Sequence, residues 1–358
     1  MTRAALRLAP LALALAAASG CEPGPKETVQ LGFRGTGMEQ VFDGDSLARV
    51  VARNVLPDSI PAVPATAPTT PGNWQNVQVL TDVSLSEFNR TMVAMTQQVS
   101  PQQGCNYCHV PGNFASDSIY TKVVARTMLR MVRDINRDWT SHVGQTGVTC
   151  WSCHRGQPVP NNVWFFTDEN QPLRHYLDRQ DARVQSASWA PSNANRSSIK
   201  QTEYTYALML SMSRSLGVNC GYCHNSPRWS SWEQSTPQRV TALRGIRMAR
   251  ALNNDYLLPL QPTFPAERLG PHGDVPKIQC ATCHQGAYRP LYGAKIAAQY
   301  PAMYWQHSTG GAVPANPTAP LDSLQAPVQT APGAPTLPVP AATPTPGQQT
   351  QPPATTPP

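Results

Sequence analysis

The chain has 358 residues, of which 37 are proline, 14% are charged and 7% are aromatic. This composition predicts a globular body with proline-rich flanks. After the N-terminus, no stretch approaches the roughly 18 consecutive apolar residues of a membrane span, so we expect a soluble body. The formal charge of +7 would ordinarily indicate nucleic acid or anionic lipid as a partner. The nine cysteines and eight histidines are the more informative feature, because most of them fall into one repeated pattern.

The N-terminus is typical of an export signal over residues 1–20. Two arginines precede an apolar run at residues 8–18, and two small residues stand before Cys21. Cys21 lies outside the repeated cysteine pattern, at the place where a bacterial lipoprotein signal has its acylated cysteine. We therefore expect lipidation of Cys21, with an ordinary signal peptide as the alternative. Two acyl chains would suffice for stable anchoring, and in either case the chain leaves the cytoplasm.

Both flanks of the body differ from it in composition. Residues 21–72 contain turn-forming glycines and a proline-rich connector, which predicts an extended arm and linker rather than a helix. Residues 308–358 are rich in proline, alanine and threonine, and Asp322 is their only charged residue. Such a tail cannot bury enough apolar surface to fold alone, so we expect disorder or polyproline II. The folded body is expected at residues 73–307.

The pattern Cys-x-x-Cys-His occurs four times. Two thiols at this spacing can add to the two vinyl groups of one porphyrin, and the adjacent histidine then faces the iron as its proximal ligand. Each copy predicts one covalently attached haem c, four in all. A disulfide framework and a zinc or thioredoxin-like site are alternatives, but neither explains the histidine after every second cysteine. The motif residues are Cys105, Cys108, His109, Cys150, Cys153, His154, Cys220, Cys223, His224, Cys280, Cys283 and His284.

Haem attachment also changes the reading of the charge. Loss of the N-terminal segment with its two arginines leaves a charge of about +5, and two propionates per haem bring it to about −3. The basic character belongs partly to the apoprotein, so we do not expect a nucleic-acid partner.

Methionine pairs at i and i+3 are candidates for the sixth iron ligands. They occur in helix-compatible segments at residues 84–98, 123–139 and 203–214, each followed by a haem motif. A single methionine at helical spacing is more often a packing residue. Six of the ten methionines fall into three such pairs, however, which favours one ligand in each pair. The pairs are Met92 with Met95, Met128 with Met131, and Met209 with Met212.

An internal repeat relates the two halves of the body. A shift of 117 positions lays Met92 on Met209 and Met131 on Met248. The sequence thus predicts a mainly α-helical protein with much coil, built as a duplicated pair of helix-plus-haem-motif units. The same shift puts Gly245 where Met128 stands. If the first methionine of each pair is the ligand, the fourth haem needs a different one.

Four histidines lie outside the motifs: His142, His175, His272 and His307. An isolated histidine is more often a surface residue or a satisfied polar residue than a ligand. His272 is close in sequence to the fourth motif and is the main candidate from spacing alone, with Met248 behind it.

Four short stretches, in this order between the motifs, resemble the tetrahaem cytochrome subunit of purple-bacterial photosynthetic reaction centres. They are Ser-Pro-Gln-Gln-Gly-Cys at residues 100–105, Gln-Thr-Gly-Val-Thr-Cys at 145–150, Ser-Thr-Pro-Gln-Arg at 235–239 and Gly-Ile-Arg-Met at 245–248. The resemblance covers about residues 73–305. In that family three haems have histidine and methionine ligands, and the fourth has two histidines. Carried over, the resemblance implies the pairs Met92 with His109, Met128 with His154, Met209 with His224, and His142 with His284.

The resemblance implies an electron-transfer subunit rather than an enzyme. It would be lipid-anchored at the periplasmic face of the photosynthetic inner membrane and bound to the integral reaction-centre subunits. It would re-reduce the photo-oxidised bacteriochlorophyll special pair. Its own electrons would come from a soluble periplasmic donor, either a c-type cytochrome or a high-potential iron-sulfur protein.

Two other functions compete with this one. A multihaem reductase of nitrite or hydroxylamine type would need an open iron, and a haem-based gas sensor would need an exchangeable ligand. Every haem motif here keeps its histidine and has a candidate sixth ligand. Filled axial positions deny a substrate access to iron, so the ligand pattern favours electron transfer.

Overall fold

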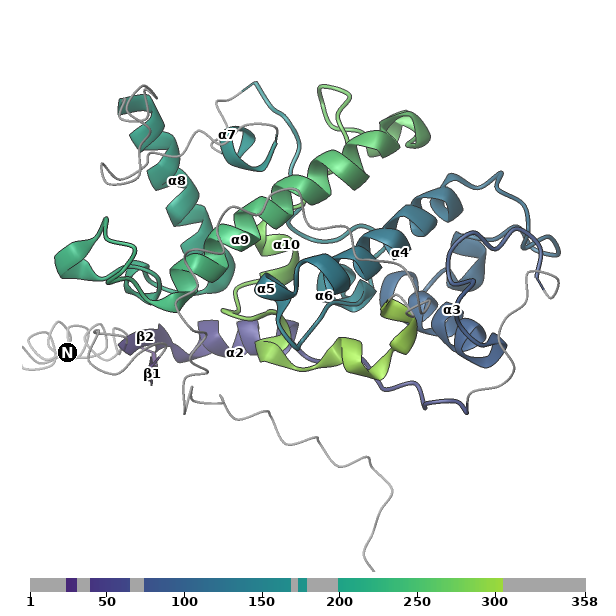
Figure 1. Ribbon diagram of the computed structural model, residues 1–358, viewed down its shortest axis with the longest axis horizontal. Helices are drawn as coiled ribbons and strands as arrows, with labels where there is room; N and C mark the ends of the chain where they lie inside the picture. Colours follow the sequence, from purple (N-terminus) through teal and green to yellow (C-terminus); the bar gives the residue numbers. More distant parts are fainter. Residues whose placement is uncertain (1–23, 31–38, 65–73, 169–172, 179–198, 305–358) are drawn as a thin grey trace, which may run out of the picture.

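The computed structural model describes residues 24–30, 39–64, 74–168, 173–178 and 199–304 (Figure 1). The expected export signal, Cys21 and the tail at residues 308–358 lie outside the described residues. Within them the chain is mainly helical with much coil, as predicted, and its strands form a single two-stranded sheet. None of the helices in this part of the chain has the length and apolar character needed to cross a membrane.

Among the described residues, the chain forms five longer helices and several short ones. The longer helices are α2 (Gly44–Arg53), α3 (Leu85–Val99), α4 (Tyr120–Asp138), α8 (Ile199–Leu216) and α9 (Pro237–Leu252). The short α-helices are α5 (Thr140–Val143), α6 (Cys150–His154), α7 (Arg174–Leu177) and α10 (Cys280–His284). A π-helical turn at Asn253–Leu257 extends α9, and 3₁₀ turns cover Gly104–Tyr107, Cys220–Tyr222, Ser226–Arg228, Leu258–Thr263, Ala266–Arg268, Pro290–Gly293, Ile296–Gln299 and Pro301–Met303.

The two halves of the body meet near its middle. Helix α3 lies at the opposite end of the molecule from α8, with α6 and α10 between them (Figure 1). Helix α6 packs against α3, α10 packs against α8, and α6 and α10 pack against each other. The two helices that carry the second and fourth motifs therefore form the junction between the halves.

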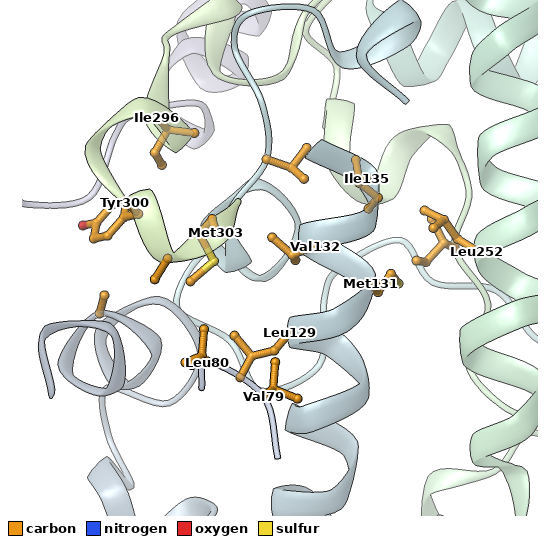
Figure 2. Packing of buried hydrophobic residues seen from close by; sticks show 14 of the residues in the cluster. Val79, Leu80, Leu129, Met131, Val132, Ile135, Leu252, Ile296, Tyr300 and Met303 are labelled. Atoms are coloured by element: carbon orange, nitrogen blue, oxygen red, sulfur yellow. The ribbon is translucent and has the colours of Figure 1, made fainter. Parts of the chain in front are cut away.

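The main hydrophobic core surrounds α4. Figure 2 shows Leu129 of this helix facing Leu80, and Val132 facing Met303 near the end of the described chain. Each such side chain contributes roughly 1.5–3 kcal/mol when it leaves water. This core joins the segment before α3, helix α4 and the C-terminal turns into one body.

The N-terminal region differs from the extended arm that the sequence predicted. Strands β1 (Lys26–Gln30) and β2 (Glu39–Asp43) pair antiparallel, and α2 follows directly. Asp43 caps this helix, its carboxylate accepting a hydrogen bond from the backbone N–H of Ser46. Because α2 buries Leu47 and packs its Val50 against Gly286, tertiary contacts favour a helix that the composition does not indicate. Residues 55–64 have neither helix nor strand.

Arg90 on α3 fastens both ends of the body to this helix. Its guanidinium donates to the carbonyls of Ile60 (2.9 Å) and Pro61 (2.8 Å) in the linker, and to the carbonyl of Gln299 (2.8 Å) near the C-terminal end. It also lies over the ring of Tyr300, 4.7 Å from the ring centroid. One buried cation thus holds two segments that are distant in the sequence.

A buried ion pair orders the segment that leads into the fourth motif. The ammonium of Lys277 bonds the carboxylate of Asp274, and the two side chains are only 4% and 9% exposed. The ammonium also lies 3.8 Å from the ring centroid of Phe166, whose backbone N–H donates to Asp274 at 2.8 Å. Burial lowers the pKa of Lys277, and its hydrogen bond to Asp274 opposes this shift.

We predict that Lys277→Met destabilises the protein by about 3–5 kcal/mol, because it leaves a buried carboxylate without its cation. Chemical unfolding of the holoprotein measures this loss as a change in the free energy of unfolding. The double variant Lys277→Met, Asp274→Leu removes both charges and should recover much of it. A single variant as stable as the unmodified protein would contradict the assigned role of the pair.

Candidate haem site

The four motifs adopt two local structures. The first and third fold as 3₁₀ turns, and the second and fourth form the short helices α6 and α10. Both short helices begin with a capping box, Thr149 with Ser152 and Gln279 with Thr282. Both end in a left-handed residue, Arg155 after α6 and Gln285 after α10. Each of these two motifs is therefore held as one rigid helical turn.

Every motif histidine is oriented by a backbone carbonyl. In each case Nδ1 lies within hydrogen-bond distance of a carbonyl oxygen a few residues further on, and since a carbonyl can only accept, Nδ1 carries the proton. That bond fixes the tautomer and leaves Nε2 free to ligate a metal. The bonds join His109 to Phe114 (3.2 Å), His154 to Gln157 (2.8 Å), His224 to Trp229 (3.0 Å) and His284 to Ala287 (2.9 Å).

Three of the motifs line one continuous cavity of about 1570 Å³. Pockets for single small molecules usually measure about 300–1,000 Å³, so this cavity has room for more than one large group. The third motif reaches it only through Tyr222. Among the predicted site residues, the lining includes Cys105, Cys108, His109, Cys150, Cys153, His154, Cys280, Cys283, His284, Met92, Met128 and His142, and omits Cys220, Cys223, His224 and Met209.

The methionine pairs lie differently in the three helices. Met92 and Met95 of α3 are both partly buried and both line the cavity. In α4, Met131 belongs to the hydrophobic core, whereas Met128 packs at its edge. In α8, Met212 is a buried member of a second core cluster between α8 and α9, and Met209 packs at the edge of that cluster. Met212 lines the cavity and Met209 does not.

His142 lies opposite the proximal histidine of the fourth motif. Its ring centroid is 6.3 Å from that of His284, with an angle of 61° between the ring planes. Two imidazoles bound to opposite sides of one metal, with metal–nitrogen bonds of about 2 Å, have centroids about 6 Å apart. Burial, with a smaller contribution from His142, lowers the pKa of His284 to about 4. Both the spacing and the neutral imidazole fit a haem iron between the two rings.

Of the two competing candidates for this position, His272 lies outside the cavity and Met248 lies in its lining. His272 is exposed, pairs with Asp168 at 3.1 Å, and is not part of the cavity lining. Met248 does line the cavity. His307 lies outside the described residues.

The same hydrogen bonds recur around the first and third motifs. Thr121 donates to the carbonyl of Tyr107, and Thr236 donates to that of Tyr222. Just after these threonines stands a cation, Lys122 in one half and Arg239 in the other. Lys122 donates to the carbonyls of Phe114 and Ser116, and Arg239 to those of Trp229 and Ser231.

A second set of bonds recurs around the second and fourth motifs. Buried Asn136 bonds both the N–H and the carbonyl of Val148, and buried Asn253 bonds both groups of Ile278 in the same way. The two asparagines are 117 positions apart, the shift found in the sequence. Such recurrence is what a duplicated pair of units would produce.

The second and fourth motifs meet at their second cysteines. The sulfurs of Cys153 and Cys283 lie within disulfide distance of each other, and their Cα atoms are 4.5 Å apart. A sulfur cannot belong to a disulfide and a thioether at once, so haem attachment at both motifs requires these two sulfurs as separate thiols. Arg155 donates to the carbonyl of Cys283, and Gln285 donates to that of Cys153, both at 3.4 Å.

Sequence reasoning missed one residue at this junction. Buried Asn54, directly after α2, accepts a hydrogen bond from Arg155 at 3.2 Å and donates to the carbonyl of Gln285 at 3.3 Å. It therefore contacts the residues that follow both proximal histidines. The available signal was the helical spacing of Leu47 and Val50 in a segment expected to be a linker.

Comparison with known proteins places this arrangement among photosynthetic cytochromes. The protein family described as "Photosynthetic reaction centre cytochrome C subunit" matches residues 22–175 and 168–304, which include all four motifs. The chain is 44% identical over 330 residues to the photosynthetic reaction center cytochrome c subunit of Thermochromatium tepidum, covering 84% of this chain and 82% of the relative. The corresponding subunit of Rubrivivax gelatinosus is 44% identical over 330 residues (84% and 90%), and that of Roseobacter denitrificans is 37% identical over 328 residues (78% and 86%).

The recurring asparagines give a stability prediction for the site. Asn253→Leu removes bonds to the N–H and carbonyl of Ile278 and to the carbonyl of Leu177. Each buried backbone group left without a partner costs about 1–3 kcal/mol, so we expect a loss of at least about 2 kcal/mol in the free energy of unfolding. Asn136→Leu is the matched variant and should lose a similar amount. Unchanged stability in both would contradict the role given to these side chains.

Proposed function

Because the chain belongs to the family of photosynthetic reaction centre cytochrome c subunits, we propose that its four motifs hold four haem c groups that re-reduce a photo-oxidised bacteriochlorophyll special pair. The coarser function follows from the family. The chain binds haem c covalently and transfers electrons in a photosynthetic reaction centre, and it is not an enzyme. It works with reaction-centre subunits at the periplasmic side of the membrane.

The observation that carries the number of haems is the common orientation of the four motif histidines. Each has its Nδ1 at a backbone carbonyl and its Nε2 free. A cysteine pair that only formed disulfides would not require this arrangement of a neighbouring ring. The cavity beside three of the motifs supports the same proposal.

We propose the axial ligand pairs that the resemblance implies: Met92 with His109, Met128 with His154, Met209 with His224, and His142 with His284. The 6.3 Å between the rings of the last pair supports two histidines on one iron. Methionine raises a haem's potential relative to histidine, so three haems would have higher potentials than the fourth. With both axial positions filled, the irons exchange electrons without binding a substrate, which disfavours the reductase alternative.

An acylated Cys21 would anchor this subunit to the membrane. The position of Cys21 in the chain then indicates which haem motif lies nearest the membrane. Four residues lie between Cys21 and the start of β1 at Lys26, so the two are at most about 18 Å apart along the chain. Gln40 on β2 accepts from the backbone N–H of Asn219 at 2.7 Å and donates to the carbonyl of Gly217 at 3.3 Å. The third motif begins at the next residue, Cys220. An anchor at Cys21 would therefore hold the third motif toward the membrane.

The soluble donor would dock transiently. Electron-transfer encounters commonly bury less than about 1,200 Å², whereas the contact with the integral subunits should be permanent. A small c-type cytochrome or a high-potential iron-sulfur protein would fill the role of donor.

Flash spectroscopy on isolated membranes tests this function directly. A light flash should oxidise haem of this chain, seen as bleaching of the reduced haem absorption, as the special pair is re-reduced. Adding a reduced soluble donor should restore the absorption. If light oxidises none of its haems, the function is wrong.

The ligands of the fourth haem are tested by redox titration. His142→Met should raise one of the four midpoint potentials and leave the other three nearly unchanged, because a thioether replaces an imidazole. His272→Met is the matched control and should leave all four unchanged. If His272→Met raises one potential and His142→Met raises none, the distal ligand is His272, and the proposal of four haems still stands.

A further inference from the structure

His142 lies directly against Gly245 of α9. A Cβ atom added to Gly245 would come within 2.9 Å of both ring nitrogens of His142 and closer still to Cε1. The backbone of Gly245 has no positive φ, so the glycine is not required by the conformation of the chain. Glycine is also among the least favourable residues inside a helix. What this position requires is the absence of a side chain.

The same turn of α9 also orients the imidazole. Nδ1 of His142 donates to the backbone carbonyl of Thr241 at 2.9 Å, four residues before Gly245. This bond leaves Nε2 unprotonated, as in the four motif histidines. Arg244 supports the arrangement by donating to the carbonyl of Ser141 at 3.4 Å, which ties α9 to the short helix that carries His142.

Gly245 stands where the repeat has Met128 in the first half. A methionine here would both offer a thioether and fill the space that the imidazole occupies. The exchange of methionine for glycine thus removes one ligand and admits another from the opposite half of the chain.

We propose that Gly245 and the Thr241 carbonyl form a seat that positions His142 as the distal ligand of the fourth haem. Gly245 is a positioning residue in this proposal, because it acts through His142. The inference rests on the proposed ligation of that haem by His142 and His284. The new element is that His142 can reach the fourth haem only because Gly245 on α9 has no side chain.

Gly245→Ala in the full-length holoprotein tests the seat. The added methyl group should displace the imidazole and leave one ferrous haem with an open position. Carbon monoxide, which binds only ferrous haem with an available sixth position, should then bind to one haem per chain, whereas the unmodified protein binds none. Gly273→Ala is the control for general destabilisation, because Gly273 has a φ of +71° that strains an alanine while the added Cβ meets no atom within 4 Å. It should bind no carbon monoxide.

A rescue variant separates positioning from a purely structural effect. In His142→Ala, Gly245→Met, the thioether should occupy the place that Met128 holds in the other half. Carbon monoxide binding should disappear again, the ferric haem should gain the weak red absorption of a methionine–iron bond, and one midpoint potential should rise. His142→Ala alone should bind carbon monoxide at one haem.

The variants distinguish failure of the seat from failure of the ligand assignment. If His142→Ala opens one haem and Gly245→Ala opens none, the seat is refuted and His142 remains the ligand. If His142→Ala opens no haem, the ligand assignment itself is refuted. Should Gly245→Ala fail to assemble, a double variant whose methionine–iron absorption does not exceed that of the unmodified protein refutes the seat by itself.

Discussion

Helices α6 and α10 lie against each other with the Cα atoms of Cys153 and Cys283 4.5 Å apart, and the two halves of the body are joined through this contact. If each motif bonds its own haem, as proposed, the edges of these two haems lie on either side of this short separation between the two helices. Arg155 and Gln285, which reach across to the opposite motif, and Asn54, which contacts both, hold this geometry. The N-terminal helix α2 is therefore part of the site and not an appendage.

Contacts between the motifs place them in the spatial order first, second, fourth and third. The second motif borders the first through Gln98 of α3, whose side chain accepts from the backbone N–H of Trp151 at 2.9 Å. The fourth motif borders the second at the junction, and the third through the ring contact of Tyr222 with Tyr288, 6.3 Å between centroids. The site proposed to carry two histidine ligands thus lies between others, and its distal ligand comes from the opposite half. A single chain can then hold haems of different potential in a fixed series.

Much of the site could be predicted from the sequence because haem attachment is a local requirement. The cysteines and proximal histidines follow from five-residue motifs, and the helices that carry Met92, Met128 and Met209 follow from periodicity and end within a few residues of the predicted limits. Residues that act over long distances could not be found in this way. His142 was singled out only by the family resemblance, because its partner His284 is 142 positions away and nothing in its own surroundings marks it.

Tertiary contacts account for what the sequence did not predict. The hairpin and α2 form in a segment rich in turn signals, because Leu47 and Asn54 are buried against the junction. For the third methionine pair, Met212 lines the cavity and the predicted ligand Met209 does not. Helical spacing identifies the pair but cannot choose its member, since that choice depends on how α8 is rotated against α9 and α10.

The most direct test of the account is the mass of the purified chain together with its tryptic haem peptides. Four covalent haems should raise the mass of the processed polypeptide by four haem groups, with two thioether bonds in each motif peptide. Cys153 and Cys283 should then be found in separate haem peptides. A mass increase of fewer than four haems, or a disulfide-linked peptide containing Cys153 and Cys283 in the active protein, would contradict the account.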